Sequence, residues 1–244
     1  MEVQGLKVDM VFADLPYNET GNKWDSKIDH KKMFDYLRVL CKKEAPMVFT
    51  GTFRFGVELF NAAPDLYKYD WVWEKDNATN IVSANHQPLR IHENIYVFGL
   101  GAVSHTPRGG YMTYNPQKTQ GKPYRCVSGR QSENWKGGNV SGFETNNESG
   151  LRHPKTIQYF CRDRGLHPTQ KPLEMMEYLV KTYSNENDTV VDLTMGSGTT
   201  GVACIKLNRN FIGCEIDKKY FDIASKRMQE ARDGKRDMEK CPRI

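Results

Sequence analysis

The sequence lacks the features that mark membrane-spanning, exported and disulfide-rich proteins. No stretch approaches the ~20 consecutive apolar residues that a transmembrane helix needs, and the first ten residues have neither the basic start nor the apolar run of a signal peptide. The six cysteines form no CxxC pair, and a chain of 244 residues does not need disulfides to stabilise a core. We therefore expect a soluble cytoplasmic protein with reduced thiols and no membrane partner.

Residues that typically bind metals are also sparse. His92 and Glu93 begin an HExxH pattern, but the pattern fails at Tyr96, where the second histidine would stand. Since the cysteines and histidines show no other zinc-binding spacing, we expect no metal site.

Positive charge is concentrated in one part of the chain. The whole sequence carries 35 basic and 30 acidic residues, a net charge of +5. Residues 104–165 alone hold ten basic and four acidic residues, a surplus of 10 − 4 = +6, together with nine glycines and interleaved tyrosines. They show neither the helical nor the alternating period of apolar residues. We expect an irregular basic insertion that contacts an acidic partner; a solvated loop is the alternative.

The rest of the chain alternates between predicted strands and predicted helices. Strands are predicted at residues 8–13, 46–50, 71–73, 93–98, 189–193 and 211–215. Helices are predicted at residues 31–43, 173–183, 199–207 and 218–231. This alternation predicts an α/β fold with a doubly wound, mostly parallel sheet and helices on both faces.

The predicted strand at residues 189–193 leads into a glycine-rich turn. Gly196, Gly198 and Gly201 have GxGxxG spacing, which permits a tight turn and close approach of a ligand to the next helix. Glu215 ends the following predicted strand, where a carboxylate can accept two hydrogen bonds from a ribose. The pattern predicts a site for an adenosine-containing cofactor; a turn needed only for packing is the alternative. No GK[ST] follows, so a phosphate-binding P-loop is excluded.

Three motifs carry a resemblance to a known family. Asp14-Leu15-Pro16-Tyr17, after the first predicted strand, resembles the DPPY motif of the DNA amino-methyltransferases. DLTMGSGTTG at residues 192–201 resembles their cofactor loop, and HPTQKP at residues 167–172 resembles the segment before that loop. With the basic insertion between them, their order is similar to that of the circularly permuted β-group of site-specific DNA methyltransferases.

The resemblance implies a Rossmann-like methyltransferase fold, S-adenosylmethionine as cofactor without a metal, and double-stranded DNA as partner, in a bacterial or phage-encoded protein. Residues 1–103 would form the catalytic half, residues 104–165 the target-recognition insertion and residues 166–244 the cofactor-binding half. A homodimer and a cognate restriction endonuclease are further partners that the resemblance brings into consideration.

The resemblance also assigns roles to residues. Cofactor contacts fall on Asp192, Gly196, Gly198, Glu215, Thr169 and Lys171. Glu215 would hold the ribose, and Thr169 and Lys171 would lie beside the methionine part. Two departures from the family pattern stand out: Leu15 replaces the first proline of DPPY, and Thr194 replaces the phenylalanine before the glycine loop.

The expected chemistry explains the residue types of the DLPY motif. An exocyclic amine of a base is a poor nucleophile because its lone pair is delocalised into the ring. The Asp14 carboxylate and the carbonyl of Leu15 or Pro16 would accept its two N–H groups and localise the lone pair. Tyr17 would stack on the flipped base. Taken singly, Asp14 could instead be a turn former at a strand end, and Tyr17 a core aromatic.

DNA contacts are expected from Arg125, Arg130 and Lys136 in the basic insertion. Asp14 and Tyr17 favour adenine N6 as the methylated amine, and cytosine N4 is the alternative. Methylation of a cytosine carbon is excluded, because no cysteine follows a proline.

Two other classes of function would each explain part of the pattern. A dinucleotide-dependent oxidoreductase would explain the glycine turn and Glu215 but not the DLPY motif. A catalytically silent DNA-binding module would explain only the insertion. Trp24 and Trp73 are interpreted as core residues, with a role in shaping the pocket as the alternative. Lys75 and His86 receive no assignment, and residues 80–90 either close over substrate or merely connect two strands.

Overall fold

The computed structural model describes residues 5–16, 28–103, 110–127, 144–163 and 170–234. Tyr17, Arg130, Lys136 and Thr169, all predicted site residues, lie outside these ranges, as does Trp24. The chain divides into two compact units, which are described separately. The first, the α/β unit, comprises residues 1–115 and 156–244, and the second, the insertion unit, comprises residues 116–155.

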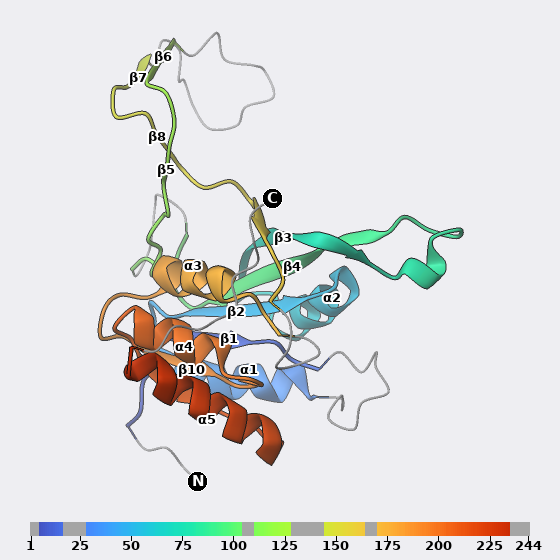
Figure 1. Ribbon diagram of the computed structural model, residues 1–244. Coiled ribbons are helices and arrows are strands. Elements are labelled where there is room, and N and C mark those ends of the chain that lie inside the picture. Colours follow the sequence, from blue (N-terminus) through green and yellow to red (C-terminus); the bar gives the residue numbers. More distant parts are fainter. Residues whose placement is uncertain (1–4, 17–27, 104–109, 128–143, 164–169, 235–244) are drawn as a thin grey trace. The chain divides into compact units, whose positions relative to one another are not determined.

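A seven-stranded sheet forms the centre of the α/β unit, in the order β11-β10-β1-β2-β4-β3-β9 (Figure 1). Its strands are β1 (Met10–Ala13), β2 (Pro46–Gly51), β3 (Tyr67–Thr79), β4 (Arg90–Gly99), β9 (Ile157–Phe160), β10 (Thr189–Asp192) and β11 (Asn210–Gly213). Strand β4 runs antiparallel to β2 and β3, and the other neighbouring pairs are parallel. The predicted doubly wound, mostly parallel sheet is confirmed.

Five helices accompany this sheet in the described part of the chain. They are α1 (His30–Leu40), α2 (Phe53–Ala62), α3 (Leu173–Tyr183), α4 (Thr199–Lys206) and α5 (Lys218–Arg232). None of the described helices is long and apolar enough to cross a membrane. The side chains of Asp29 and Asp217 accept hydrogen bonds from backbone amides and so cap α1 and α5.

The alternation of side chains along β1 shows how the sheet separates two cores. Val11 and Ala13 belong to a buried cluster with residues of α1 and α2, such as Phe34. Met10 and Phe12 belong to a second cluster with residues of α3 and α4. Because successive strand residues point to opposite faces, helices cover both faces of the sheet, as a doubly wound fold requires.

The main differences from the predicted elements concern short or mixed segments. Helix α2 was not predicted, because its apolar residues do not all fall on one face. Phe53 and Phe60 are apolar but lie on the exposed side of the helix, which obscures the apolar stripe in the sequence. Strand β9 lies within residues 104–165, which were expected to be irregular, and it joins the sheet beside β3. The prediction that Glu215 ends a strand is wrong: β11 ends at Gly213, and Glu215 lies in the loop before α5.

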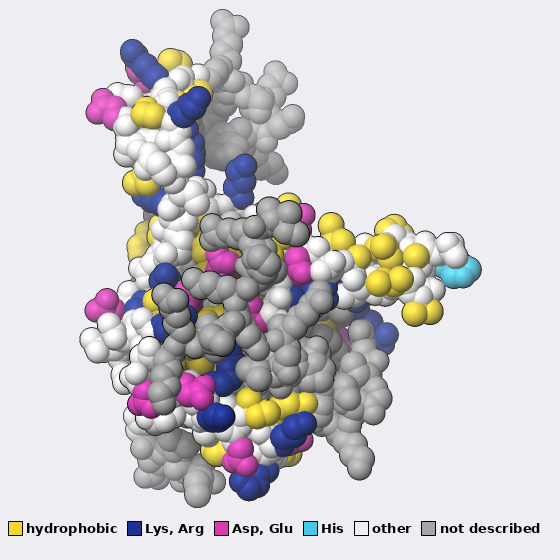
Figure 2. Space-filling view, viewed as in Figure 1, with side chains coloured by type: hydrophobic (Ala, Val, Ile, Leu, Met, Phe, Trp, Pro, Cys, Tyr) yellow, Lys and Arg dark blue, Asp and Glu magenta, His cyan; other side chains and the backbone are white. Residues whose placement is uncertain are grey.

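Strands β3 and β4 continue past the sheet as a long hairpin with a 3-10 turn, η1 (Ile81–Ser83). Its tip exposes Ile81 and the whole side chain of Val82, which is 100% exposed. Figure 2 shows hydrophobic side chains gathered on this hairpin. Residues 80–90 are therefore the tip of a projecting hairpin.

The insertion unit consists of short antiparallel pairs. Strand β5 (Thr119–Gln120) pairs with β8 (Leu151–Arg152), and β6 (Tyr124–Val127) pairs with β7 (Glu144–Asn147). Nearly all its described side chains are exposed or half-exposed. These strands give the expected irregular insertion more regular structure than its sequence pattern indicated, because backbone hydrogen bonds form ladders without an apolar period.

Candidate active site

Three carboxylates lie at one edge of the sheet. Asp14 follows β1, Asp192 ends β10, and Glu215 lies two residues after β11. These strands are neighbours and parallel, so their carboxyl ends meet at the same edge, where ligands bind in open α/β sheets. The structure thus brings together the predicted catalytic acid and two predicted cofactor residues.

The glycine turn after β10 is held by two of these carboxylates. Asp192 accepts a hydrogen bond from the Thr194 amide at 3.0 Å and from the Thr200 hydroxyl at 2.5 Å. Glu215 accepts hydrogen bonds from the Gly196 amide at 2.9 Å and the Asp217 amide at 2.8 Å. Both carboxylates therefore have fixed orientations before any ligand binds.

The glycines of the turn are required by backbone geometry and by packing. Gly196 and Gly198 have φ angles of 51° and 80°, in the left-handed region that favours glycine. A Cβ on Gly198 would also lie 2.8 Å from the Cβ of Ala224 on α5. Packing therefore does require glycine at this turn, and this requirement is compatible with a cofactor site.

Asp192 is fully buried, and burial raises its pKa to about 7, with smaller contributions from the charges of Asp14 and Glu215. A cationic ligand beside this edge would relieve the cost of the buried charge. The donors and acceptors present, three carboxylates and the amides at the start of α4, fit a cofactor with ribose hydroxyls and positive charge. S-adenosylmethionine meets both requirements.

Asp14 is held at the rim of the site by neighbouring strands and loops. The Thr50 hydroxyl, at the end of β2, donates to Asp14 Oδ1 at 2.6 Å, and Lys171 Nζ donates to Oδ2 at 2.5 Å. The Asp14 amide donates to Thr194 Oγ1 at 3.1 Å. Thr194, one of the two departures from the family pattern, thus ties the DLPY segment to the glycine turn. Leu15, the other, is buried in the core.

Lys171 was expected beside the methionine part of the cofactor, and the structure shows it paired with Asp14. Its ammonium also lies 3.7 Å from Glu93 Oε2 on β4, and Glu93 is in turn paired with Lys75 on β3. Sequence reasoning missed the contribution of Glu93, although ionisable residues inside strands of apolar and aromatic residues were a signal. Trp73 is buried, as its interpretation as a core residue predicted, and Lys75, which had no predicted role, is buried as well.

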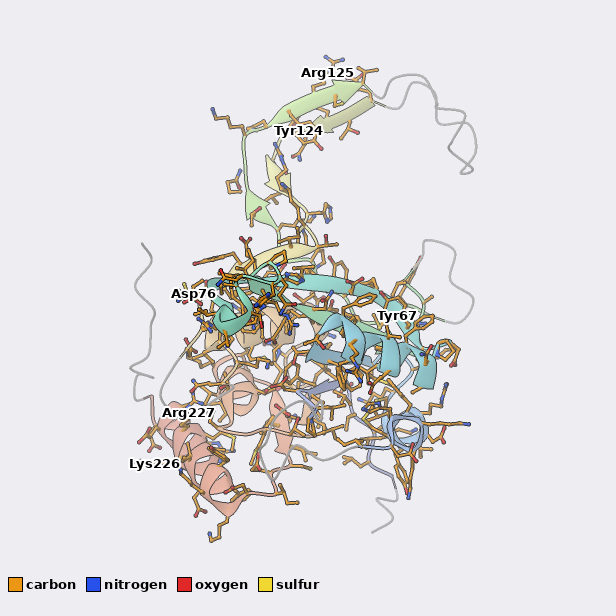
Figure 3. All side chains as sticks on the ribbon, turned by 90° about the vertical axis from the view of Figure 1, so that its right-hand side faces the viewer. Tyr67, Asp76, Tyr124, Arg125, Lys226 and Arg227 are labelled. Carbon is orange, nitrogen blue, oxygen red and sulfur yellow. The ribbon has the colours of Figure 1, made fainter. Side chains whose placement is uncertain are left out.

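Arg227 is a second residue that sequence reasoning missed. It is buried on α5, and its Nη1 donates to the Ser197 carbonyl at 2.9 Å and to Ser197 Oγ at 3.2 Å (Figure 3). It therefore holds the glycine turn against α5. No sequence signal identifies it, because its contact depends on how α5 packs against α4.

Of the three predicted DNA-binding residues, the described part of the chain contains Arg125, on β6 (Figure 3). It forms an exposed ion pair with Glu144 on β7, and the Arg152 guanidinium stacks 4.4 Å above the ring of Tyr124. Arg162, counted with the basic stretch, belongs to the α/β unit and pairs with Asp76 there. The described residues of the insertion unit carry five basic and two acidic residues, a surplus of 5 − 2 = +3.

Among the described residues, no group of three or more histidine, cysteine, aspartate or glutamate side chains is placed to hold a metal ion. The sheet, the glycine turn and the carboxylates at the strand ends define a Rossmann-like fold of the methyltransferase class.

The family follows from the sequence as a whole. A family model described as DNA methylase, of the N6/N4 type, matches residues 8–226. The chain therefore belongs to the N6/N4 DNA methylase family, whose cofactor is S-adenosylmethionine.

Individual relatives are similar over most of their length. The Type II methyltransferase M.HpaI of Haemophilus parainfluenzae is 27% identical over 96% of this chain and 74% of its own. The DNA adenine methyltransferase YhdJ of Escherichia coli is 28% identical over 94% of this chain and 79% of its own. Type II methyltransferases among the relatives associate the chain with DNA methylation in restriction-modification.

Solved structures give the same assignment of the fold. The crystal structure of the M1.HpyAVI–SAM complex superposes with a TM-score of 0.62 at 25% identity, covering 92% of this chain and 90% of that one. The cytosine-N4-specific PvuII DNA methyltransferase superposes with a TM-score of 0.59 at 11% identity, covering 94% and 86%. The latter shows the fold alone.

Proposed function

We propose that this protein methylates the N6 amine of adenine within a specific double-stranded DNA sequence, after flipping the adenine out of the duplex. The observation that carries the proposal is the Asp14 carboxylate, fixed at the sheet edge next to the glycine turn. A relative over most of the chain is named a DNA adenine methyltransferase, which also supports adenine. The oxidoreductase alternative has no support in the family assignment, since the family is one of DNA methylases.

The Asp14 carboxylate would accept one N–H of the target amine, and the backbone carbonyl of Leu15 or Pro16 would accept the other. These two acceptors draw the lone pair out of conjugation with the ring and aim it away from the motif. Methyl transfer to the nitrogen would break the S–C bond of the bound donor, and the Asp14 carboxylate or water would take the proton that the nitrogen then loses. Leu15 can replace proline here because the motif contributes a carbonyl, not a side chain.

The cofactor is proposed to lie along the glycine turn. Glu215 would accept hydrogen bonds from the ribose, while Asp192, Gly196, Gly198 and Thr169 would line the rest of the site. When bound, S-adenosylmethionine supplies an electrophilic methyl group on a sulfonium. The geometric support is that Glu215 uses one hydrogen bond per oxygen on the backbone and so keeps lone pairs for a ligand.

DNA is proposed to be bound by the basic side chains of the insertion, including Arg125, Arg130 and Lys136, and Tyr17 to stack on the flipped base. This division of labour follows the proposed domains: a catalytic half at residues 1–103, target recognition at 104–165 and the cofactor half at 166–244. A homodimer, a cognate restriction endonuclease and a cytoplasmic location for a bacterial or phage-encoded protein stay predictions.

The choice of base is tested by expressing the protein in a host without DNA methylation, digesting the DNA to nucleosides and separating them by mass spectrometry. We expect N6-methyl-deoxyadenosine in excess over the same host carrying the Asp14→Ala variant. N4-methyl-deoxycytidine alone would overturn the assignment to adenine and leave the family assignment intact, because both amines present two N–H groups to the same acceptors.

A further inference from the structure

A line of alternating charges runs from the site into the sheet. It begins at Asp14 after β1 and continues through Lys171, just before α3, to Glu93 on β4 and Lys75 on β3. The DLPY resemblance accounts for Asp14, and the HPTQKP resemblance places Lys171 beside the methionine part of the cofactor. Neither explains why Lys171 bonds to Asp14, nor why Glu93 and Lys75 lie next to it.

These charges are largely removed from water. The side chains of Lys171, Glu93 and Lys75 are 10%, 18% and 6% exposed. Lys75 Nζ also lies 5.0 Å from the centre of the Trp73 ring, whose π-electrons attract a cation. Burying four ionised groups is costly unless each is paired with an opposite charge. Removing one partner leaves an uncompensated buried charge.

The Lys171 ammonium has two carboxylates within reach but bonds closely to only one. It lies 2.5 Å from Asp14 Oδ2 and 3.7 Å from Glu93 Oε2. Glu93 Oε2 is buried and accepts no hydrogen bond from any described residue, whereas Glu93 Oε1 is bonded to Lys75. A buried acceptor without a donor is unfavourable. A shift of the ammonium by about 1 Å would bring it to hydrogen-bonding distance from this oxygen.

The observed pairing conflicts with the role of Asp14. Thr50 already donates to Asp14 Oδ1 and Lys171 to Oδ2, so both oxygens are engaged. A short bond to an ammonium is charge-assisted and stronger than a bond from a neutral amine. While it lasts, the carboxylate is a poor acceptor for the target N–H.

We propose that the Lys171 ammonium is a switch that moves from Asp14 to Glu93 when the target amine arrives, freeing Asp14 Oδ2 to accept the amine. This inference rests on the proposed role of Asp14. Glu93 and Lys171 are positioning residues: they act on the target amine through Asp14. Lys75 anchors the receiving carboxylate by bonding its other oxygen.

The electrostatics suit such a transfer. Burial alone would lower the pKa of Lys171, but Asp14 and Glu93 outweigh it and hold that pKa above its ordinary value. Burial would raise the pKa of Glu93, but Lys171 and Lys75 outweigh it and hold that pKa below its ordinary value. The ammonium therefore stays charged and has a carboxylate partner in both positions, while Asp14 exchanges the ammonium for the N–H of the target amine.

The test compares Glu93→Gln with Lys171→Met. The first removes the receiving charge and leaves the ammonium fixed on Asp14; the second removes the ammonium and leaves Glu93 paired with Lys75. We measure single-turnover transfer of labelled methyl groups to unmethylated genomic DNA at mildly alkaline pH, cofactor binding by calorimetry, and thermal unfolding. Glu74→Gln is the matched control, because Glu74 lies on the neighbouring strand β3 with its side chain on the other face.

We expect Glu93→Gln to slow methyl transfer by about 10- to 100-fold while cofactor affinity stays within about 2-fold. Lys171→Met should retain faster transfer than Glu93→Gln, and Glu74→Gln should match the unmodified protein. A merely structural ion pair predicts equal losses from its two halves. Equal losses, a slower Lys171→Met, or an unaffected Glu93→Gln would each overturn the switch.

Two further measurements keep the outcome interpretable. If Glu93→Gln does not fold, Glu93→Asp takes its place, since it keeps the charge but withdraws the receiving oxygen by one methylene; the same slowing is expected. Asp14→Ala separates the two proposals. If the unmodified protein methylates no adenine, or Asp14→Ala stays active, the proposed function fails. If both behave as proposed but Glu93→Gln transfers normally, only the switch fails.

Discussion

The sheet edge that carries the candidate active site and the insertion unit place charge in opposite ways. At the edge, Asp14, Asp192 and Glu215 are each held by at least two hydrogen bonds, and Asp192 is fully buried. In the insertion unit, nearly all described residues are exposed or only partly buried, and the Arg125–Glu144 pair lies at the surface. The difference suits the proposed roles, which need fixed acceptors at the edge and accessible charge in the insertion unit.

Physical chemistry explains why the two regions differ. Reaction at an amine needs acceptors fixed to within a fraction of an ångström, which packing and hydrogen bonds supply. Attraction of a DNA backbone needs positive charge near the surface, where side chains can adjust to phosphates. Loss of a single group should therefore be severe at the edge and mild in the insertion unit.

The largest expected effect is at Asp14. Asp14→Ala should reduce methyl transfer by about 1,000-fold or more, because it removes the charged acceptor of the reacting amine. Cofactor affinity should change by less than about 3-fold, since Glu215 and the glycine turn are untouched. Transfer of labelled methyl groups and calorimetry measure the two quantities. A loss of cofactor binding as large as the loss of transfer would contradict the separation of roles.

Glu215 should show the complementary pattern. Glu215→Ala removes the proposed ribose acceptor and leaves the Gly196 and Asp217 amides without their partner. We expect cofactor affinity to fall by about 10- to 100-fold, as for the loss of one or two charge-assisted bonds. Asp222→Ala on the exposed side of α5 is the control. Calorimetry showing unchanged affinity in Glu215→Ala would remove Glu215 from the cofactor site.

The insertion gives a smaller and distributed effect. Neutralising Arg125, Arg130 and Lys136 together should weaken DNA binding by about 10-fold and lower the slope of log affinity against log salt by up to about 2 to 3. Cofactor binding should not change. Glu144→Gln, which frees Arg125 from its ion pair, should have the opposite effect on DNA affinity and strengthen binding. If the triple variant binds DNA with unchanged affinity at all salt concentrations, the basic insertion does not contribute to DNA binding.

The smallest effect concerns pH. The pKa of Asp192 is raised to about 7 by burial, so the folded protein holds this proton more tightly than the unfolded chain, whose aspartates titrate near pH ~4. Its contribution to stability is therefore lost as pH rises from about 4 to about 7, and stays lost above. A cofactor with a sulfonium charge compensates the ionised form. The increase in melting temperature on adding S-adenosylmethionine should thus be larger at pH ~8 than at pH ~5.5.

Asp192→Asn should make that increase independent of pH, because the amide does not titrate, while Asp222→Asn should behave as the unmodified protein. Thermal unfolding monitored by circular dichroism measures both. An equal cofactor effect at the two pH values in the unmodified protein would show that Asp192 does not respond to the cofactor's charge.

Prediction from sequence worked best where the pattern was local and strong. Helix α3 was predicted with both its ends, because an apolar stripe follows a proline and stops at a polar segment. Strand β3 was predicted at only three of its residues, Trp71 to Trp73, since the rest of it alternates without a clear apolar face. Strand β9 was hidden because a short edge strand next to glycine- and arginine-rich sequence has little signal of its own.

By itself, the sequence determined the class of fold, the glycine turn and the acidic residues that follow the parallel strands. These depend on periodicity and on residue types at fixed spacing, which a chain carries wherever it folds. Only the tertiary structure decided which charges meet. Lys171 is 157 positions from Asp14 and 78 from Glu93, and Arg227 is 30 from Ser197. Such contacts arise from the order of strands in the sheet and from the packing of helices on it, and no local pattern encodes either.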